Sequence, residues 1–279
     1  DRTVGHLVEE YLAQRRQSED KKLKATATVE FDRYNLRRMT DFMTKGIAVD
    51  AIDFDLWHRW GEHCQSMAET AEWAEKTAKS TLTGSKAWVQ WLYTSGRIEK
   101  LPRNFDAYKV RVTAKEPVTF TAAELKKVYG AADDESRLLM LLALNTGANQ
   151  IDIATLEYAQ SAKDLGLWLP AGTIRRKRVK TRKVERVPVV RYVLWPETLA
   201  LLGQFRHKTG PLVLRNSAGS PWVHRVRGQE GKYTNTDALG LRFNRLLEEV
   251  GVKDKGKSFK TLRATSASFL GNSEAYRPY

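Results

Sequence analysis

Apolar residues recur at helical spacing through residues 1–100. After Thr3, which can cap a helix, one face collects Val4, Leu7, Val8, Tyr11 and Leu12. This spacing predicts a helix to about residue 16, and the polar run at 15–24 is predicted to be a loop. Three further helices are predicted at about residues 27–45, 54–67 and 74–94, with Gly46 stopping the first of them and Ser95-Gly96 the last. Four helices joined by short polar loops predict a compact bundle.

Tryptophans are frequent along these predicted helices. Aromatic side chains at helical spacing are usually buried, so we expect a core built on Trp57, Trp60, Trp73, Trp88 and Trp91. Basic residues alternate with them and either follow a phosphate backbone or form a solvated face: Arg33, Arg37, Arg38, Lys76, Lys79 and Lys86.

A change of pattern separates this half from the rest of the chain. Residues 101–118 contain Pro102 and Pro117, scattered charge and no sustained period, which predicts an interdomain linker. Thr121 and Glu124 then have the spacing of a capping box, the signature of a helix start. The prediction is therefore two domains, at residues 1–100 and 119–279, which fits a length of 279 residues.

The second domain is predicted to mix helices with a small antiparallel sheet. Helices at about 122–132 and 135–145 lead to a turn at Gly147, and Asn149 is a preferred N-cap residue for a short helix at Gln150–Leu156. The remaining predicted elements are strands at 167–169, 173–179 and 184–190, a tight basic turn at 180–183, a helix from Pro196 to about His207, loops and short strands at 210–234, and helices at about 237–250 and 259–270.

The net charge of the chain limits the classes of binding partner. The chain has 47 Lys+Arg against 33 Asp+Glu, a formal net charge of +14. Between Arg175 and Arg186, eight of twelve positions are basic, a density that repels itself unless it faces an anion. No long apolar span or basic amphipathic anchor is visible, so a membrane is disfavoured and double-stranded DNA is the favoured partner.

Cysteine and histidine usage limits the chemistry. Cys64 is the only cysteine, so neither an internal disulfide framework nor a cysteine-rich metal site can form, which suits a reducing cytoplasm. His58 and His63 are five residues apart, off one helical face, and no carboxylate pair accompanies them. A metal-dependent nuclease is therefore disfavoured, and no metal or small-molecule cofactor is expected.

The order of these segments resembles the tyrosine recombinases of the phage-integrase family, whose members move phages and other mobile elements. The resemblance is carried by the corner at Leu141–Glu157, the basic hairpin at 175–186 and Lys260-Thr261-Leu262-Arg263, after a helical N-terminal half. It implies a core-binding, SAM-like helical domain followed by the mixed α+β catalytic domain. The two domains are then expected to clamp duplex DNA.

The resemblance also implies residue roles. In the family a tyrosine attacks the phosphate and forms a 3′-phosphotyrosine link, two arginines bind the non-bridging oxygens, and a hairpin lysine protonates the leaving oxygen. The catalytic positions then fall at Asn149, Lys180, Lys260 and Arg263. Lys177 and Lys183 are rivals of Lys180, and Asp152 matches an acidic residue that supports the first arginine. Phosphate or groove contacts are expected from Arg175, Arg176, Lys177, Arg178 and Lys183.

Two departures accompany the match. Asn149 stands where the family has its first arginine, and an asparagine supplies neither charge nor a two-pronged donor. Tyr276 and Tyr279 follow Arg263 too closely to match the nucleophile, so we expect them to be structural and the C-terminal tyrosine segment to be missing from this sequence.

Three functions follow, from different classes. The first is a site-specific DNA recombinase that assembles as a homotetramer on DNA and that we expect to be inactive as this sequence stands. The second is a catalytically degenerate DNA-binding relative, which Asn149 favours. The third is the metal-dependent nuclease disfavoured above.

Overall fold

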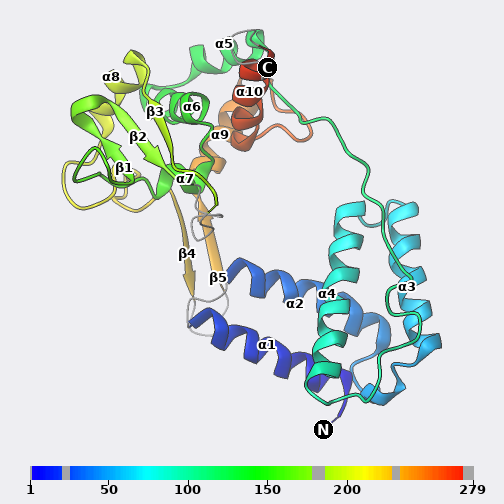
Figure 1. Cartoon of the computed structure of the whole chain (residues 1–279). Coiled ribbons are helices and arrows are strands. Elements are labelled where there is room, and N and C mark those ends of the chain that lie inside the picture. The colour runs from blue at the N-terminus through cyan, green and yellow to red at the C-terminus, as the bar shows by residue number, and fades with distance from the viewer. Residues whose placement is uncertain (1, 21–25, 178–185, 228–232, 273–279) are drawn as a thin grey trace. The chain divides into compact units, whose positions relative to one another are not determined.

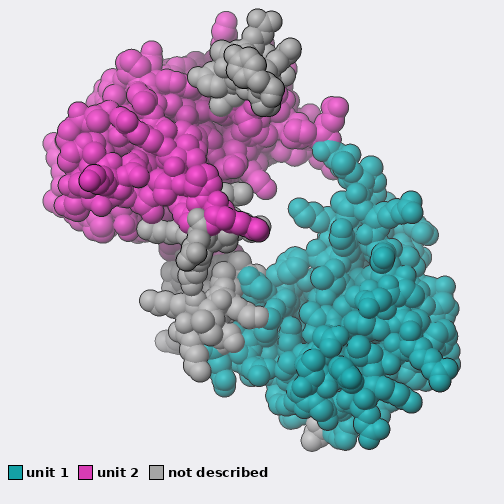
Figure 2. Space-filling model, in the orientation of Figure 1, with its two compact units in different colours: residues 1–115 teal, residues 116–279 magenta. Residues whose placement is uncertain are grey.

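The computed structural model describes residues 2–20, 26–177, 186–227 and 233–272. The chain forms two compact units, residues 1–115 and 116–279, each with its own hydrophobic core (Figure 1; Figure 2). The boundary between the units falls within the stretch predicted to be a linker. Among the described residues, no helix is both long enough and apolar enough to traverse a bilayer.

Unit 1 is a helical bundle, as the apolar spacing predicts. Its helices are α1 (Val4–Asp20), α2 (Thr26–Met43), α3 (Phe54–Glu69) and α4 (Glu75–Thr94), with a 3₁₀ turn at Val49–Ala51. The loop predicted from residue 15 is wrong as far as Asp20, because α1 continues there. Arg15 reaches Asp32 on α2, with 2.6 Å between Nη2 and Oδ2, and this ion pair holds the polar turn of α1 against its neighbour.

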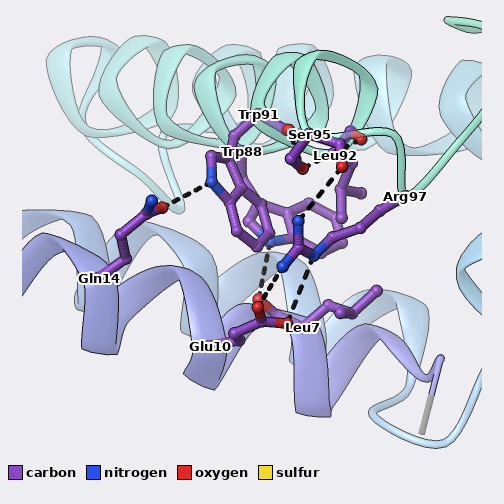
Figure 3. Close-up of polar contacts among 8 residues, drawn as sticks. All are labelled: Leu7, Glu10, Gln14, Trp88, Trp91, Leu92, Ser95 and Arg97. Carbon is purple, nitrogen blue, oxygen red and sulfur yellow. Dashed lines mark hydrogen bonds and ion pairs between the residues drawn. The ribbon is translucent and has the colours of Figure 1, made fainter.

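Tryptophans form the centre of this bundle. Trp57, Trp60 and Trp88 are fully buried, whereas Trp73 and Trp91 are only partly buried at its edge. Figure 3 shows how the indoles join α4 to α1: Trp88 Nε1 donates to the Leu7 carbonyl at 3.4 Å, and Trp91 Nε1 donates to a side chain of α1 at 2.7 Å. The polar atoms of the Trp88 and Trp91 rings are therefore satisfied.

An arm at residues 101–110 packs against the bundle rather than linking the units. The Phe105 ring stacks on Trp57 with 5.5 Å between centroids, and the Tyr108 ring lies directly over Gly61 of α3. Val110 is buried in the same core. The exposed connector is therefore shorter than the predicted linker. The apolar residues of the arm have no helical spacing, but they still pack against the helical bundle.

Unit 2 has the predicted mixed architecture. Its elements are α5 (Ala122–Ala131), α6 (Asp134–Thr146), α7 (Gln150–Ala154), β1 (Gly166–Trp168), a 3₁₀ turn (Leu169–Ala171), β2 (Thr173–Arg176), β3 (Val190–Val193), α8 (Pro196–Phe205), β4 (Val223–Arg227), β5 (Tyr233–Asp237), α9 (Ala238–Glu249) and α10 (Phe259–Asn272). The described strands form a three-stranded sheet, β1-β2-β3, and a two-stranded sheet, β4-β5, with antiparallel pairing throughout. The capping box at the start of α5 is confirmed.

Strand β2 lies within the strand predicted at 173–179, but its partner is not the strand predicted at 184–190. β2 pairs with β3 from Thr173 opposite Val193 to Arg176 opposite Val190. The strand predicted at 184–190 is wrong, since within the described residues it contributes only its last residue to β3. Buried Leu194 donates its N–H to the Gly172 carbonyl at 2.9 Å and fixes this register. The predicted turn at 180–183 lies outside the described residues.

Helix α6 runs through the core of unit 2. It packs against α8 on one side and α10 on another, and residues such as Leu138, Met140 and Leu142 are almost fully buried. Phe243 of α9 and Phe259 of α10 meet edge to face with 5.3 Å between ring centroids. A helix buried this way fixes the place where its C-terminus ends, and the candidate site forms there.

Candidate functional site

The corner after α6 is set by two residues with defined backbone requirements. Gly147 ends α6 in the left-handed conformation, with φ of 59°. Asn149 then caps α7, because its Oδ1 accepts the N–H of Asp152 at 3.0 Å. Asp152 Oδ2 accepts the N–H of Asn149 at 3.3 Å in return. The predicted cap is confirmed, and it is half of a reciprocal capping box.

Two arginines reach this corner from different elements. Arg263 of α10 donates from Nη1 to the Gly147 carbonyl at 2.8 Å. Arg176 of β2 donates from Nη2 to the Thr146 carbonyl at 3.0 Å. Consecutive carbonyl groups of one turn therefore hold two guanidinium groups whose residues are far apart in the sequence.

Helix α10 is tied to its neighbours around Arg263. Ser266 Oγ donates to the Leu144 carbonyl of α6 at 2.6 Å. Thr265 Oγ1 accepts the Phe120 N–H at 2.9 Å. The first contact holds this part of α10 against the end of α6, and the second holds it against the segment before α5. Lys260 lies one turn earlier on α10 and is exposed.

Asp152 is the anion of the cluster. Its side chain is fully buried, and Oδ2 lies 2.7 Å from Nη1 of Arg176, whose own side chain is 13% exposed. The Arg176 guanidinium also lies over the Tyr192 ring, 5.5 Å from its centroid. A buried carboxylate requires a cation close by, and here Arg176 provides it. From the resemblance we expected Asp152 to support the side chain at position 149. Its carboxylate instead accepts the backbone N–H of Asn149 and helps to cap α7.

The described residues of the basic run do not share a single surface. Arg175 faces away from Arg176, as alternation along a strand requires, and its Nη1 donates to the Ala162 carbonyl at 3.2 Å. Lys177 is half-buried at the end of β2. Arg178, Lys180 and Lys183 lie outside the described residues, so the choice of hairpin lysine stays open.

Sequence reasoning missed the pairing of Arg176 with Asp152. A signal was present, because Arg176 is two residues beyond Ile174 and therefore shares the strand face of a side chain that is 2% exposed. In a run with so many basic residues, that position was not separable from its neighbours. Its partner follows from tertiary structure alone.

His58 and His63 of unit 1 make aromatic contacts. The His63 ring stacks on Phe42 with 4.7 Å between centroids, and His58 Nδ1 is hydrogen-bonded to the Tyr108 hydroxyl. Across the part of the chain that the structure describes, no group of three or more histidine, cysteine or acidic side chains is placed to hold a metal ion.

Comparison with solved structures addresses the fold. A lambda integrase dimer bound to a COC′ core site superposes with a TM-score of 0.67 at 14% identity, covering 97% of this chain and 90% of that one. The fold is that of the integrases. A lambda integrase tetramer bound to a Holliday junction gives a TM-score of 0.68 at 14% identity, covering 98% of this chain and 74% of the other.

The integrase fold is also found in a second set of structures. The Tn1549 transposon integrase in complex with a circular intermediate DNA matches with a TM-score of 0.64 at 16% identity, covering 98% of this chain and 88% of that one. These neighbours are tyrosine recombinases, so the fold predicted from the resemblance is confirmed. No protein-family model matches the sequence, and no curated protein matches it.

Proposed function

We propose that the chain binds duplex DNA and acts as a site-specific recombinase of the tyrosine class. One observation carries the proposal: Arg263 is held at the corner after α6, on the Gly147 carbonyl, beside a second guanidinium. The integrase fold supports it, since the solved neighbours are bound to DNA. The surplus of basic residues supplies the attraction that any duplex requires.

The proposed reaction requires positive charge beside the phosphate that is attacked. When a tyrosine oxygen attacks a backbone phosphate, the P–O bond to the sugar 5′-oxygen breaks and negative charge gathers on the non-bridging oxygens. A guanidinium donates two parallel N–H groups to such oxygens, which makes arginine the suited residue. Arg263 takes this role in the proposal. Lys177, Lys180 and Lys183 are the candidates for protonating the departing 5′-oxygen.

DNA binding is tested with the chain and a labelled duplex of random sequence, titrated at several salt concentrations. The affinity should fall with a log–log slope of about −0.9 for each phosphate bound. Arg263→Gln should weaken binding and flatten the slope, whereas Arg245→Gln, at an exposed arginine of α9, should change both less. If the chain binds no duplex at 50 mM salt, roughly the low end of the range where such binding is strong, the proposal fails.

The alternative is a DNA-binding relative that does not cleave, and Asn149 favours it. Asn149 contributes no charge, and loss of one transition-state donor costs on the order of 10² to 10³ in rate. Duplexes selected for tight binding, each nicked near the bound site so that cleavage cannot reverse, separate the two when they are offered to the chain with a C-terminal tyrosine segment restored. A protein–DNA adduct that survives denaturation supports the recombinase. Tight binding without any adduct supports the relative.

Assembly on DNA is part of the proposal. A lambda integrase tetramer is bound to a Holliday junction in its structure, and we propose the same stoichiometry for this chain on a four-way junction. Mass photometry of the chain with a synthetic junction should show four protomers per junction. Four protomers that bind one to each arm, without associating with one another, would give the same count at saturating protein. Linear duplex of equal length is the control, and it should bind fewer protomers per DNA molecule.

A further inference from the structure

We infer that Arg176 supplies the second guanidinium of the phosphate site, the role that Asn149 cannot fill. This inference rests on the proposed function, because the anion in question is a DNA backbone phosphate. It differs from the expectation that the basic run as a whole contacts DNA. It assigns one arginine of that run to the same phosphate as Arg263 and gives its neighbour, Arg175, no such part.

The first argument is position. Arg176 Nη2 and Arg263 Nη1 donate to the carbonyls of adjacent residues, at 3.0 Å and 2.8 Å. Both guanidiniums therefore lie beside one turn, and on this ground the inference assigns them to one phosphate. A guanidinium carries five donors, and the carbonyl of Thr146 and the carboxylate of Asp152 engage only some of those of Arg176.

The second argument is charge. Asp152 pairs with Arg176, and Arg263 brings a further positively charged group to the same turn, which suits a phosphodiester. The carboxylate also accepts the Asn149 N–H at 3.3 Å, which ties it to the start of α7. The Asp152 carboxylate therefore holds the Arg176 guanidinium in a fixed orientation. The Tyr192 ring packs over the same guanidinium.

The third argument is what Asn149 does. Its side chain is committed to the cap of α7, with 3.0 Å between Oδ1 and the Asp152 nitrogen. An arginine at 149 could not make this bond. The corner gains a capping residue by taking its cation from β2, and the buried carboxylate is satisfied by a side chain from another element. Relocation of the arginine accounts for the asparagine and for the inward-facing Arg176 together.

The competing explanation is that Arg176 only neutralises Asp152. The two explanations separate when both charges are removed together, because a pair with a purely structural role then leaves no buried charge behind. We therefore compare Asp152→Asn, which keeps the guanidinium, with Asp152→Asn/Arg176→Gln, which lacks it. The two proteins differ only at residue 176. Arg175→Gln is the control for loss of one positive charge on the opposite face of β2.

Binding to the tight duplex selected above is the readout, together with the melting temperature of each protein. We expect the double variant to bind at least about tenfold more weakly than Asp152→Asn, since a charged hydrogen bond is lost. Its salt slope should fall by about 0.9, the value for one phosphate. Arg175→Gln should lose less. Equal affinity and equal slope for Asp152→Asn and the double variant overturn the inference.

A phosphate scan tests whether the two arginines share one target. In a series of duplexes, one backbone phosphate at a time is replaced by a neutral methylphosphonate. For Asp152→Asn, the replacement of one particular phosphate should lower the affinity for the duplex. The same replacement should not change the affinity of the double variant or of Arg263→Gln. Responses that disappear at two different phosphates overturn the shared site.

Two further outcomes have fixed meanings. If the double variant does not fold, Arg176→Lys replaces it, because lysine keeps the charge beside Asp152 but loses the fork. Arg176→Lys should then bind more weakly than wild type, and wild-type affinity overturns the inference. If the unmodified chain binds no duplex at all, the proposed function fails, and that result is distinct from any difference between the variants.

Discussion

Asn149 is the residue at which this chain departs most from the resemblance, and its local role is clear. Its side chain and that of Asp152 close a capping box across the first turn of α7. The box satisfies two backbone N–H groups that a short helix would otherwise leave unpaired. The same position thus has a structural function that an arginine would remove.

Replacing Asn149 with arginine should therefore cost stability. We expect Asn149→Arg to lower the free energy of unfolding by about 1 kcal/mol, the usual cost of losing an N-cap. Asn149→Ser, which keeps a capping oxygen, should lose only a few tenths of that. Urea unfolding of both variants measures the difference. An Asn149→Arg protein as stable as wild type would show that the cap contributes nothing here.

Arg176 makes a larger prediction at the same scale. Arg176→Met leaves the fully buried Asp152 carboxylate without its cation, which should cost about 3–5 kcal/mol. Adding Asp152→Asn should restore most of the loss, because the uncompensated charge disappears. Thermal unfolding of the single and double variants measures both effects. A single variant that loses under about 1 kcal/mol would mean that solvent reaches the carboxylate.

Among elements, α5 depends on its first turn and on a contact from the loop before α10. Thr121 Oγ1 accepts the Glu124 N–H at 3.2 Å, and Glu124 accepts the Thr121 N–H at 2.9 Å. Lys257 donates a hydrogen bond to the Glu124 carboxylate. This hydrogen bond, followed by the one from Thr121, lowers the pKa of Glu124 below its usual 4.5.

The lowered pKa fixes a pH dependence. A carboxyl whose pKa falls on folding adds stability above the pKa of the unfolded chain and loses it as the pH drops through the folded value. Glu124→Gln should therefore destabilise the protein at pH 7, by less than about 1 kcal/mol for so accessible a group. At about pH 3 the variant and the wild type should melt together. A difference that is constant with pH would assign the effect to packing.

The arm at residues 101–110 depends on a glycine of α3. A Cβ at Gly61 would overlap the Tyr108 ring, whereas a Cβ at Gly46 meets nothing within 4 Å. Gly61→Ala should cost about 1–3 kcal/mol, because the arm must lift or the helix must shift. Gly46→Ala is the matched control and should change little. Tyr108→Ala combined with Gly61→Ala should recover part of the loss, measured by thermal unfolding.

At the scale of the whole molecule, the two units are separate cores joined by exposed chain. Residues 111–118 are exposed and belong to no helix or strand. Within it, the N–H and the hydroxyl of Thr113 both donate to Glu75 of α4, at 2.7 Å and 2.9 Å. The connector is therefore accessible backbone between two folded bodies.

Limited trypsin digestion should cut first in this connector, at Arg111 or Lys115. Two fragments that match the units should accumulate, because each has its own core. Mass spectrometry of early time points identifies the cut. Initial cleavage within a described helix of either unit would contradict two independently folded bodies. Glu75→Gln should speed the cut, since it weakens the tie to Thr113.

Local patterns in the sequence were enough for the elements with strong periods or caps. The helices of unit 1, the capping box at Thr121, the N-cap at Asn149 and strand β2 all follow from residues close together in the chain. Where the local signal was ambiguous, the predicted boundaries were wrong. Helix α1 continues through a polar run, where Arg15 forms an ion pair with Asp32 of α2. Residues 101–110 cover the bundle for a similar reason.

By itself, then, the sequence determined the helical first half, the mixed second half and the basic character, and the resemblance suggested Arg263 as a candidate for binding phosphate. Only the tertiary structure decided which arginine stands beside it. Capping and periodicity act over a few residues, so they can be read along the chain. The ion pair of Arg176 with Asp152 arises because a buried carboxylate is unstable without a cation, and β2 brings that cation from 24 residues away in sequence.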